Sequence, residues 1–194
     1  MMMYKELLSA VAIALTFIAF FPYIRSILQG KTKPHAFSWV IWGSTTFIVF
    51  LAQLADKGGA GAWPIGVSGV ITIYVALLAY IKKSDSMITR ADWLFLILAT
   101  SSLPFWYFTS DPLWAVVILT TVDLLGFGPT FRKAYIRPYE EQLMFFMIMA
   151  ARNFISIVAL EHYSLTTVLF PALTGIAVLI FILMVTYRRR RLSG

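Results

Sequence analysis

The chain contains no cysteine, and few of its residues are charged. Its 194 residues include nine Asp and Glu and two His, and charged residues make up 13%. The absence of cysteine excludes disulfides, thiolate nucleophiles and cysteine-ligated metals. The two histidines, His35 and His162, are far apart in the sequence and do not make a metal site. No phosphate-binding loop and no catalytic pair of carboxylates is present, so we expect no enzyme, no metal and no cofactor.

Apolar residues, by contrast, make up 60% of the chain. Soluble domains carry about 25% charged residues, well above the fraction found here. Several apolar runs approach the roughly 20 residues that a helix needs to cross a bilayer. In lipid, each backbone group must be paired within the protein, which favours helices. The sequence therefore predicts an all-α polytopic membrane protein, whose first apolar segment is a retained helix and not a cleaved signal peptide.

Seven membrane-spanning helices are predicted. They cover approximately residues 5–29, 36–55, 62–81, 91–109, 112–136, 141–160 and 166–187. The net charge of +7 comes mainly from Lys and Arg in alternate connections and in the final run Arg188–Arg191. The positive-inside rule assigns these basic segments to the cytoplasm. We therefore expect an N-terminus outside, a cytoplasmic C-terminus and no nucleic-acid partner.

Two parts of the chain match each other at an offset of 107 residues. The offset pairs Pro22 with Pro129 and Arg25 with Arg132, and it places the first three predicted helices on the last three without a gap. The fourth helix has no counterpart, which gives a 3+1+3 plan. The expected units are a first triple-helix repeat, a linker helix, and a second, parallel repeat with a basic tail, at residues 1–83, 84–110 and 111–194. Such internal repeats are typical of transporters that bind solutes near the bilayer midplane.

A proline lies in the cytoplasmic half of the first and fifth predicted helices, and a basic loop follows the first of them. The stretch from Phe21 to Lys33, followed by Phe37-Ser38-Trp39, and the 3+1+3 plan together resemble the SWEET and PQ-loop superfamily. Tyr23 and Thr130 stand where that family's Pro-Gln motif has glutamine, so the chain resembles a divergent member. The resemblance implies facilitated or proton-coupled movement of small solutes by alternating access.

Pro22 and Pro129 are candidates for hinges. Proline within a helix removes one backbone hydrogen bond and clashes with the preceding turn. Two repeat-related prolines would let the cytoplasmic ends of their helices open and close an inner gate. The alternative is that each proline produces only a static kink.

Asp123 and Arg152 are ionisable residues within predicted spans, where charge is costly and usually functional. Their predicted depths are similar, which allows them to interact. Asp123 is the candidate for proton or ion coupling, and Arg152 can hold a carboxylate or phosphate of a substrate. A third functional interpretation is that the two residues form a pair that breaks and reforms during the transport cycle. The alternative is a permanent neutral pair that only fixes helix packing.

Further residues are candidates for a substrate site. Asn153 offers both donors and acceptors, and the Trp42 ring can stack on a ligand. The resemblance places the family pocket near Ser68 and Thr174, and Phe47 can form a wall. Helix packing, interhelical hydrogen bonding or anchoring at the membrane interface is the alternative for each. The candidates for substrate binding are Trp42, Phe47, Ser68, Arg152, Asn153 and Thr174.

These features predict a transporter of a small polar or zwitterionic metabolite in the plasma (inner) membrane of a prokaryote. The expected partners are a small-molecule solute and the lipid bilayer, and homo-oligomerisation stays open. One rival is a membrane receptor or sorting protein that binds a ligand on the same fold without moving it. A second is a structural subunit of a larger complex.

Overall fold

A computed structural model describes residues 2–30, 36–82, 90–127, 131, 134–136, 138–140 and 143–192. No strand occurs in these ranges, which confirms the all-helical prediction. The long helices are α1 (Met2–Leu28), α2 (Ala36–Ala55), α3 (Trp63–Ile81), α4 (Arg90–Thr109), α5 (Pro112–Gly126), α7 (Leu143–Ala159) and α8 (Leu165–Leu192). Two short 3-10 helices, η1 (Gly59–Ala62) and η2 (Pro138–Glu140), lie in connections.

The observed helices follow the predicted ranges closely, except that the fifth is shorter. The α5 helix begins after Asp111, whose carboxylate accepts a hydrogen bond from the Leu113 N–H at 2.9 Å, and Pro112 occupies its first turn. It ends at Gly126 and not near residue 136. A glycine at this point and a proline three residues later both disfavour continuation of the helix.

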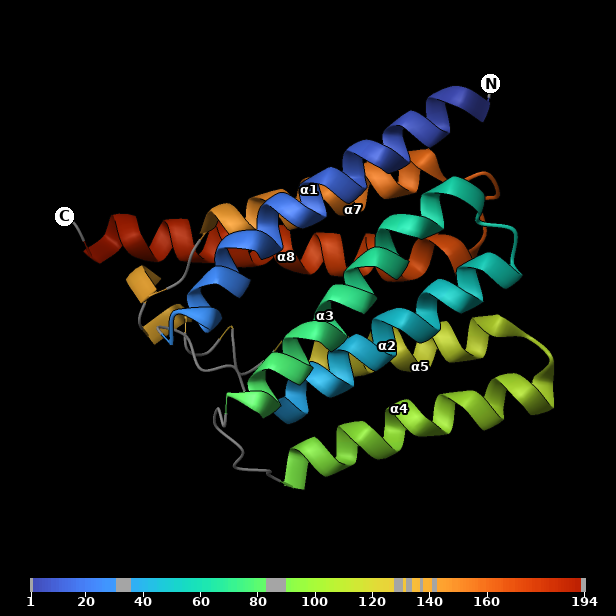
Figure 1. Ribbon diagram of the computed structural model, residues 1–194, viewed down its shortest axis with the longest axis horizontal. Helices are drawn as coiled ribbons and strands as arrows, with labels where there is room; N and C mark the ends of the chain where they lie inside the picture. The colour runs from blue at the N-terminus through green and yellow to red at the C-terminus, as the bar shows by residue number, and fades with distance from the viewer. Residues whose placement is uncertain are drawn as a thin grey trace.

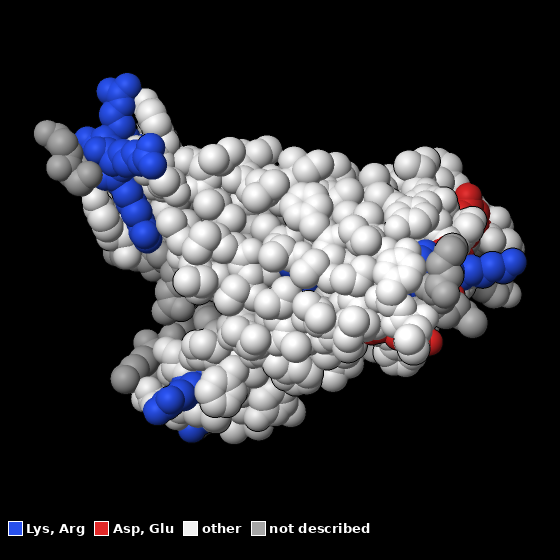
Figure 2. Space-filling model, turned by 90° about the horizontal axis from the view of Figure 1, so that it is seen from above, with Lys and Arg blue, Asp and Glu red and all other residues white. Residues whose placement is uncertain are grey.

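Three segments, Met3–Leu28, Gly59–Ile81 and Leu165–Leu192, are long and apolar enough to cross a bilayer. Shorter apolar helices cover Trp39–Ala55, Pro112–Gly126 and Leu143–Ala159. Many large apolar side chains on these helices are exposed, as is usual for a lipid-facing surface. Figure 2 shows a broad uncharged belt between two ends of the molecule that carry charge. The long apolar helices and this belt are compatible with a membrane protein.

The long helices pack in an order that is the same in the two halves of the chain (Figure 1). In the first half, α3 contacts both α1 and α2; in the second, α8 contacts both α5 and α7. The halves meet where α1 packs on α7 and where α2 packs on α5. These contacts close α1, α3, α2, α5, α8 and α7 into a ring. The remaining helix, α4, lies outside the ring against α5 and α2.

The bundle has an N-terminal end, where α1 begins, and a basic end, where α8 finishes with Arg188–Arg191. At the basic end, the Arg189 Nε–H donates to the Pro138 carbonyl at 3.0 Å and the Tyr139 hydroxyl donates to the Arg189 carbonyl at 3.1 Å. Figure 2 shows Lys and Arg gathered at this end, whereas the acidic residues on the visible face lie at the other. Basic residues therefore mark the basic end, whereas acidic and basic residues lie together at the N-terminal end.

Helices α2 and α3 approach each other closely at glycines. A Cβ added to Gly43 would lie 2.9 Å from the backbone nitrogen of Ile73, and one added to Gly69 would lie 3.0 Å from that of Phe47. Small residues permit such close backbone approach between membrane helices. The α2–α3 pair is thus a tightly packed unit with no room for a side chain at these positions.

Candidate functional site

Arg152 is the central residue of the candidate site. It lies on α7, and its side chain is only 4% exposed. Its Nη2 group donates to the Ser68 hydroxyl of α3 at 3.3 Å. Its Nε and Nη1 groups have no hydrogen-bond acceptor within the protein. A buried guanidinium with unpaired donors is unfavourable, because the lost hydration is not replaced.

Asp123 lies on α5, half-buried, one turn before the helix ends. It is close enough to Arg152 for the two charges to interact electrostatically. No direct ion pair joins these two described residues. This interaction is consistent with the prediction from the sequence that Asp123 and Arg152 lie at similar depths in the membrane. Their charges offset each other, although the two side chains do not form a closed salt bridge.

Asn153 and Thr174 are brought together between α7 and α8. The Asn153 Nδ2 group donates to the Thr174 hydroxyl at 3.1 Å, and that hydroxyl donates to the Phe170 carbonyl at 2.7 Å. The interhelical hydrogen bond named as the alternative for Asn153 is therefore present. The Asn153 Oδ1 atom is nevertheless buried without a donor, so it keeps a free acceptor position.

Trp42 and Phe47, both on α2, lie in different surroundings. A Cβ at Gly126 would lie 2.9 Å from the Trp42 Nε1 atom, so the edge of the indole faces α5 at a glycine. Gly126 is three residues beyond Asp123 and hence on the same face of α5. Phe47 packs in an apolar cluster, with its ring centroid 5.8 Å from that of Phe50. Trp42 therefore stays a candidate for substrate contact, whereas the contacts of Phe47 are those of a packing residue.

Pro22 lies within α1, its side chain is exposed, and the helix continues beyond it to Leu28. Its neighbour Tyr23 stacks on Trp39 of α2 at a centroid distance of 5.1 Å. Phe20 meets Phe145 of α7 edge-on at 5.7 Å. The proline is therefore next to an aromatic cluster that joins three helices near the basic end. Pro129 lies outside the described residues, and the hinge stays a prediction.

A hydrogen-bonded seam closes the N-terminal end of the bundle. The Ser9 hydroxyl of α1 donates to the Ala60 carbonyl at 2.7 Å, and the Ala60 N–H donates to the Glu161 carboxylate at 3.0 Å. The Glu161 N–H donates to the Gly58 carbonyl at 3.1 Å. We call these four residues, Ser9, Gly58, Ala60 and Glu161, the N-terminal seam. It ties the connection before α3 to the connection before α8.

Other contacts strengthen the same end. The Lys5 ammonium donates to the Leu160 carbonyl. A Cβ on Gly61 would lie 2.4 Å from the Leu160 backbone nitrogen, so η1 and the end of α7 are in direct backbone contact. The fully buried Gln53 donates from Nε2 to the Thr167 carbonyl at 2.6 Å. The sequence alone did not identify these contacts. Its only signal was Gln53, the only amide side chain in the largely apolar α2 segment.

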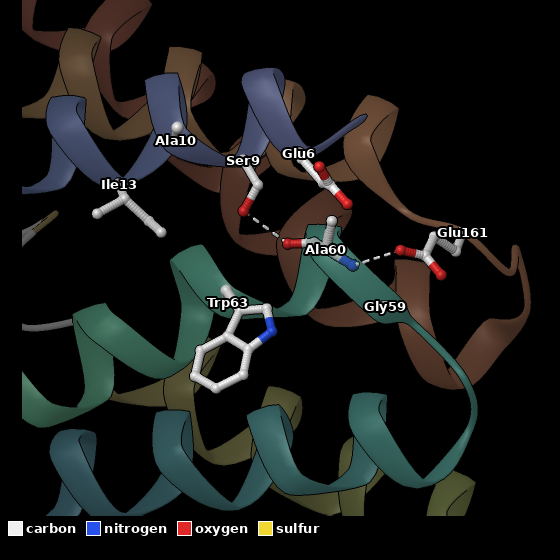
Figure 3. Close-up of a pocket in the computed structure, with 8 residues that line it drawn as sticks. All are labelled: Glu6, Ser9, Ala10, Ile13, Gly59, Ala60, Trp63 and Glu161. Atoms are coloured by element: carbon white, nitrogen blue, oxygen red, sulfur yellow. Dashed lines mark hydrogen bonds between the residues drawn. The ribbon is translucent and has the colours of Figure 1, made fainter. Parts of the chain in front are cut away.

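A surface pocket of about 400 Å³ opens beside the N-terminal seam (Figure 3). It lies between α1, η1 and the residues before α8, and its lining includes Glu6, Trp63 and Glu161. None of the residues predicted to bind substrate lines it. This pocket is therefore distinct from the group around Arg152.

In comparisons with protein-family models, curated proteins and solved structures, nothing matched this chain. Within the described ranges, no three His, Asp or Glu side chains come together in a way that could hold a metal ion. The residues around Arg152 have the chemistry needed to recognise a ligand. They provide one buried cation, one half-buried acid and several hydroxyl and amide groups, and they come from helices of both halves.

Proposed function

We propose that this chain is an integral membrane protein with seven transmembrane helices that transports a small polar metabolite by alternating access. The first triple-helix unit would be α1, α2 and α3, and the second would be α5, α7 and α8, with α4 as the linker. The N-terminus would be outside and the basic end cytoplasmic, in the plasma (inner) membrane of a prokaryote. The solute would bind between the two units.

The packing order of the helices supports a repeated architecture. A shift of 107 residues carries α1, α2 and α3 onto α5, α7 and α8. Under the same shift, the contact of α1 with α7 becomes a contact of α5 with α2, and both contacts occur. Two units related in this way can rock against each other about their shared interfaces, which is the usual motion of repeat-built transporters.

The observation that carries the proposal is the unpaired guanidinium of Arg152 between the two units. A protein selected only for stability would pair or replace such a group, because a buried cation lacking acceptors is costly. Ionisable residues inside membrane proteins usually mark a solute or ion pathway. The Arg152 side chain is also buried, as the group that binds a solute would be when both gates are shut.

The two ends of the bundle would act as alternate gates. The N-terminal seam joins the units by hydrogen bonds, whereas near the basic end Tyr23, Trp39 and Phe145 join them by ring contacts. Ring contacts are less directional than hydrogen bonds and can slide as helices move. Pro22, which lies within α1, would allow the bending of that helix that this motion requires.

Uptake into proteoliposomes tests the proposal. Purified protein is reconstituted, and entry of labelled sugars, amino acids, carboxylates, nucleosides and vitamins is compared with that into empty vesicles. At least one solute should exchange faster across protein-containing vesicles and saturate with concentration. Saturable binding without exchange of any bound solute would favour the receptor alternative and overturn transport.

A reversible cross-link separates the two functions further. Because the natural chain has no cysteine, the double variant Ala60→Cys/Glu161→Cys, which spans the two units at the seam, carries the only thiols available to a cleavable bifunctional reagent. Cross-linking should stop uptake, and reductant should restore it, because the seam must open in each cycle. The two single-cysteine variants are matched controls. Unchanged uptake in the cross-linked protein would contradict a gate at the seam.

A further inference from the structure

We infer that the transported solute is a monocarboxylate, bound by Arg152 and carried together with one proton on Asp123. This inference rests on the proposed transport function and names the chemical class of its solute. It follows from the unpaired donors of Arg152, the indirect interaction of the two charges, and the requirement that a buried site stay close to neutral.

The donors of Arg152 identify the chemistry of the solute. Ser68 occupies one donor of Nη2, and the N–H groups of Nε and Nη1 have no acceptor. Together with the second N–H of Nη2, one of these groups makes a planar fork of charged donors that matches the two oxygens of a carboxylate. A phosphate would bring about 1.5 to 2 negative charges at neutral pH. One arginine cannot balance that charge, so a singly charged carboxylate fits better.

Charge balance then requires the proton. With no solute, the charges of the Asp123 carboxylate and the Arg152 guanidinium offset each other. A solute carboxylate on Arg152 would leave one excess negative charge in a site of low dielectric, where unpaired charge is strongly unfavourable. Protonation of Asp123 removes that excess. The site is neutral before and after loading only if one carboxylate and one proton enter together.

The same balance gives an order of events. A proton from the N-terminal side neutralises Asp123 and leaves the Arg152 charge free to attract the solute carboxylate. On the other side, loss of that proton restores the negative charge of Asp123, which competes with the solute for Arg152 and favours its release. No bond other than that to the proton is made or broken.

Among the described residues, the surroundings of Asp123 leave Arg152 as its main charged neighbour. Helix α5 packs against α2, α4 and α8, and α2 carries no ionisable side chain. The ionisable residues of α4 and α8 lie toward the ends of these helices, and they are Arg90, Asp92, Tyr107, Tyr187 and Arg188–Arg191.

Ligand-dependent thermal stability tests carboxylate recognition. The probes are acetate, propanoate, lactate, pyruvate and benzoate, each compared with its own neutral amide. We expect at least one carboxylate to raise the unfolding temperature and its amide not to, and we expect Arg152→Gln to abolish the shift. Thr45→Gln, at the position 107 residues earlier, is the matched control and should keep it. If no carboxylate shifts the protein, or if acid and amide act equally, the inference is wrong.

Asp123→Asn tests the proton. The variant mimics the protonated acid, so it should bind the carboxylate at all pH values and still exchange labelled for unlabelled carboxylate. It should lose accumulation driven by a pH gradient, by about tenfold or more relative to the natural chain. Gradient-driven accumulation that persists would overturn the coupling. Saturable uptake of a sugar or an amine with no carboxylate uptake would overturn this inference and leave the transport proposal standing, whereas no uptake of any solute would overturn transport itself.

Discussion

Residues 107 positions apart lie on helices that pack in the same order in the two halves of the ring, yet they make different contacts. In the first half, the Thr16 hydroxyl donates to the Ala12 carbonyl and the Thr45 hydroxyl to the Trp42 carbonyl, both at 2.9 Å and both within their own helix. The counterparts of Thr16 and Thr45 are Asp123 and Arg152, which interact between helices. At these two positions, the first-half hydroxyls bond within their own helix, and their second-half counterparts interact between helices.

The two halves also differ in how closely their helices approach each other at glycines. In the first half, Gly43 and Gly69 hold α2 and α3 so close that an added Cβ would meet backbone atoms within 3.0 Å. In the second half, the nearest atom to a Cβ on Gly175 would be Asn153 Cβ at an ordinary contact distance of 3.5 Å. The first half therefore resembles a rigid support. The second half has the looser packing and the polar groups that a binding site needs.

The largest expected effect comes from removing both buried charges. We expect Asp123→Leu/Arg152→Met to abolish carboxylate uptake and to raise stability by about 1 to 4 kcal/mol, because replacing interacting charges inside a protein by apolar residues is often stabilising. Stability can be measured by unfolding in mixed micelles. Arg152→Met alone should lower stability, since Asp123 then loses its counter-charge.

Matched changes in the first half are the control for that prediction. Thr16→Val and Thr45→Val remove hydroxyls that bond only within their own helix. They should leave uptake within about twofold of the natural chain and change stability by about 1 kcal/mol or less, the worth of a single hydrogen bond. If Thr45→Val stops uptake as Arg152→Met does, the functional difference between the halves does not exist.

The next largest effect concerns the glycines. Gly43→Ala should destabilise the protein by about 1 to 3 kcal/mol, the usual cost of overpacking, because its Cβ would lie 2.9 Å from the Ile73 nitrogen. Gly175→Ala should be nearly neutral, since its Cβ would have ordinary contacts. Unfolding of the two variants under identical conditions gives the comparison. Equal destabilisation would mean that the halves are packed alike.

Much of this architecture could be predicted from the sequence. Apolar runs, charge placement and turn residues gave ranges near those of α1, α2, α3 and α4. The end of α5 was missed because hydropathy continues past Gly126 even though glycine and proline disfavour the helix there. Periodicity and polarity also identified Arg152 and Asn153, since polar groups are rare in an apolar helix.

The partners of those residues required the structure. Ser68 and Arg152 are 84 residues apart, and nothing local in either helix specifies that they meet. The N-terminal seam was equally hidden, because it uses backbone groups of Gly58 and Ala60 that any sequence would supply. The side-chain types therefore indicated the candidate residues, and the packing of the helices determined what those residues contact.

The smallest expected effect is the coupling between Asn153 and Thr174. A double-mutant cycle with Asn153→Ala and Thr174→Ala should give an interaction energy of about 0.6 kcal/mol and at most about 1.7, as for other hydrogen bonds between membrane helices. The corresponding cycle in the first half, Thr46→Ala with Val67→Ala, should give a value near zero, because valine cannot accept or donate. Reversible unfolding of the four variants, their two double variants and the natural chain gives both energies. A first-half coupling as large as that of Asn153 with Thr174 would show that the polar contact adds nothing specific. A clear difference would show that, at this pair of positions, the second half has gained a hydrogen bond between helices that the first half lacks.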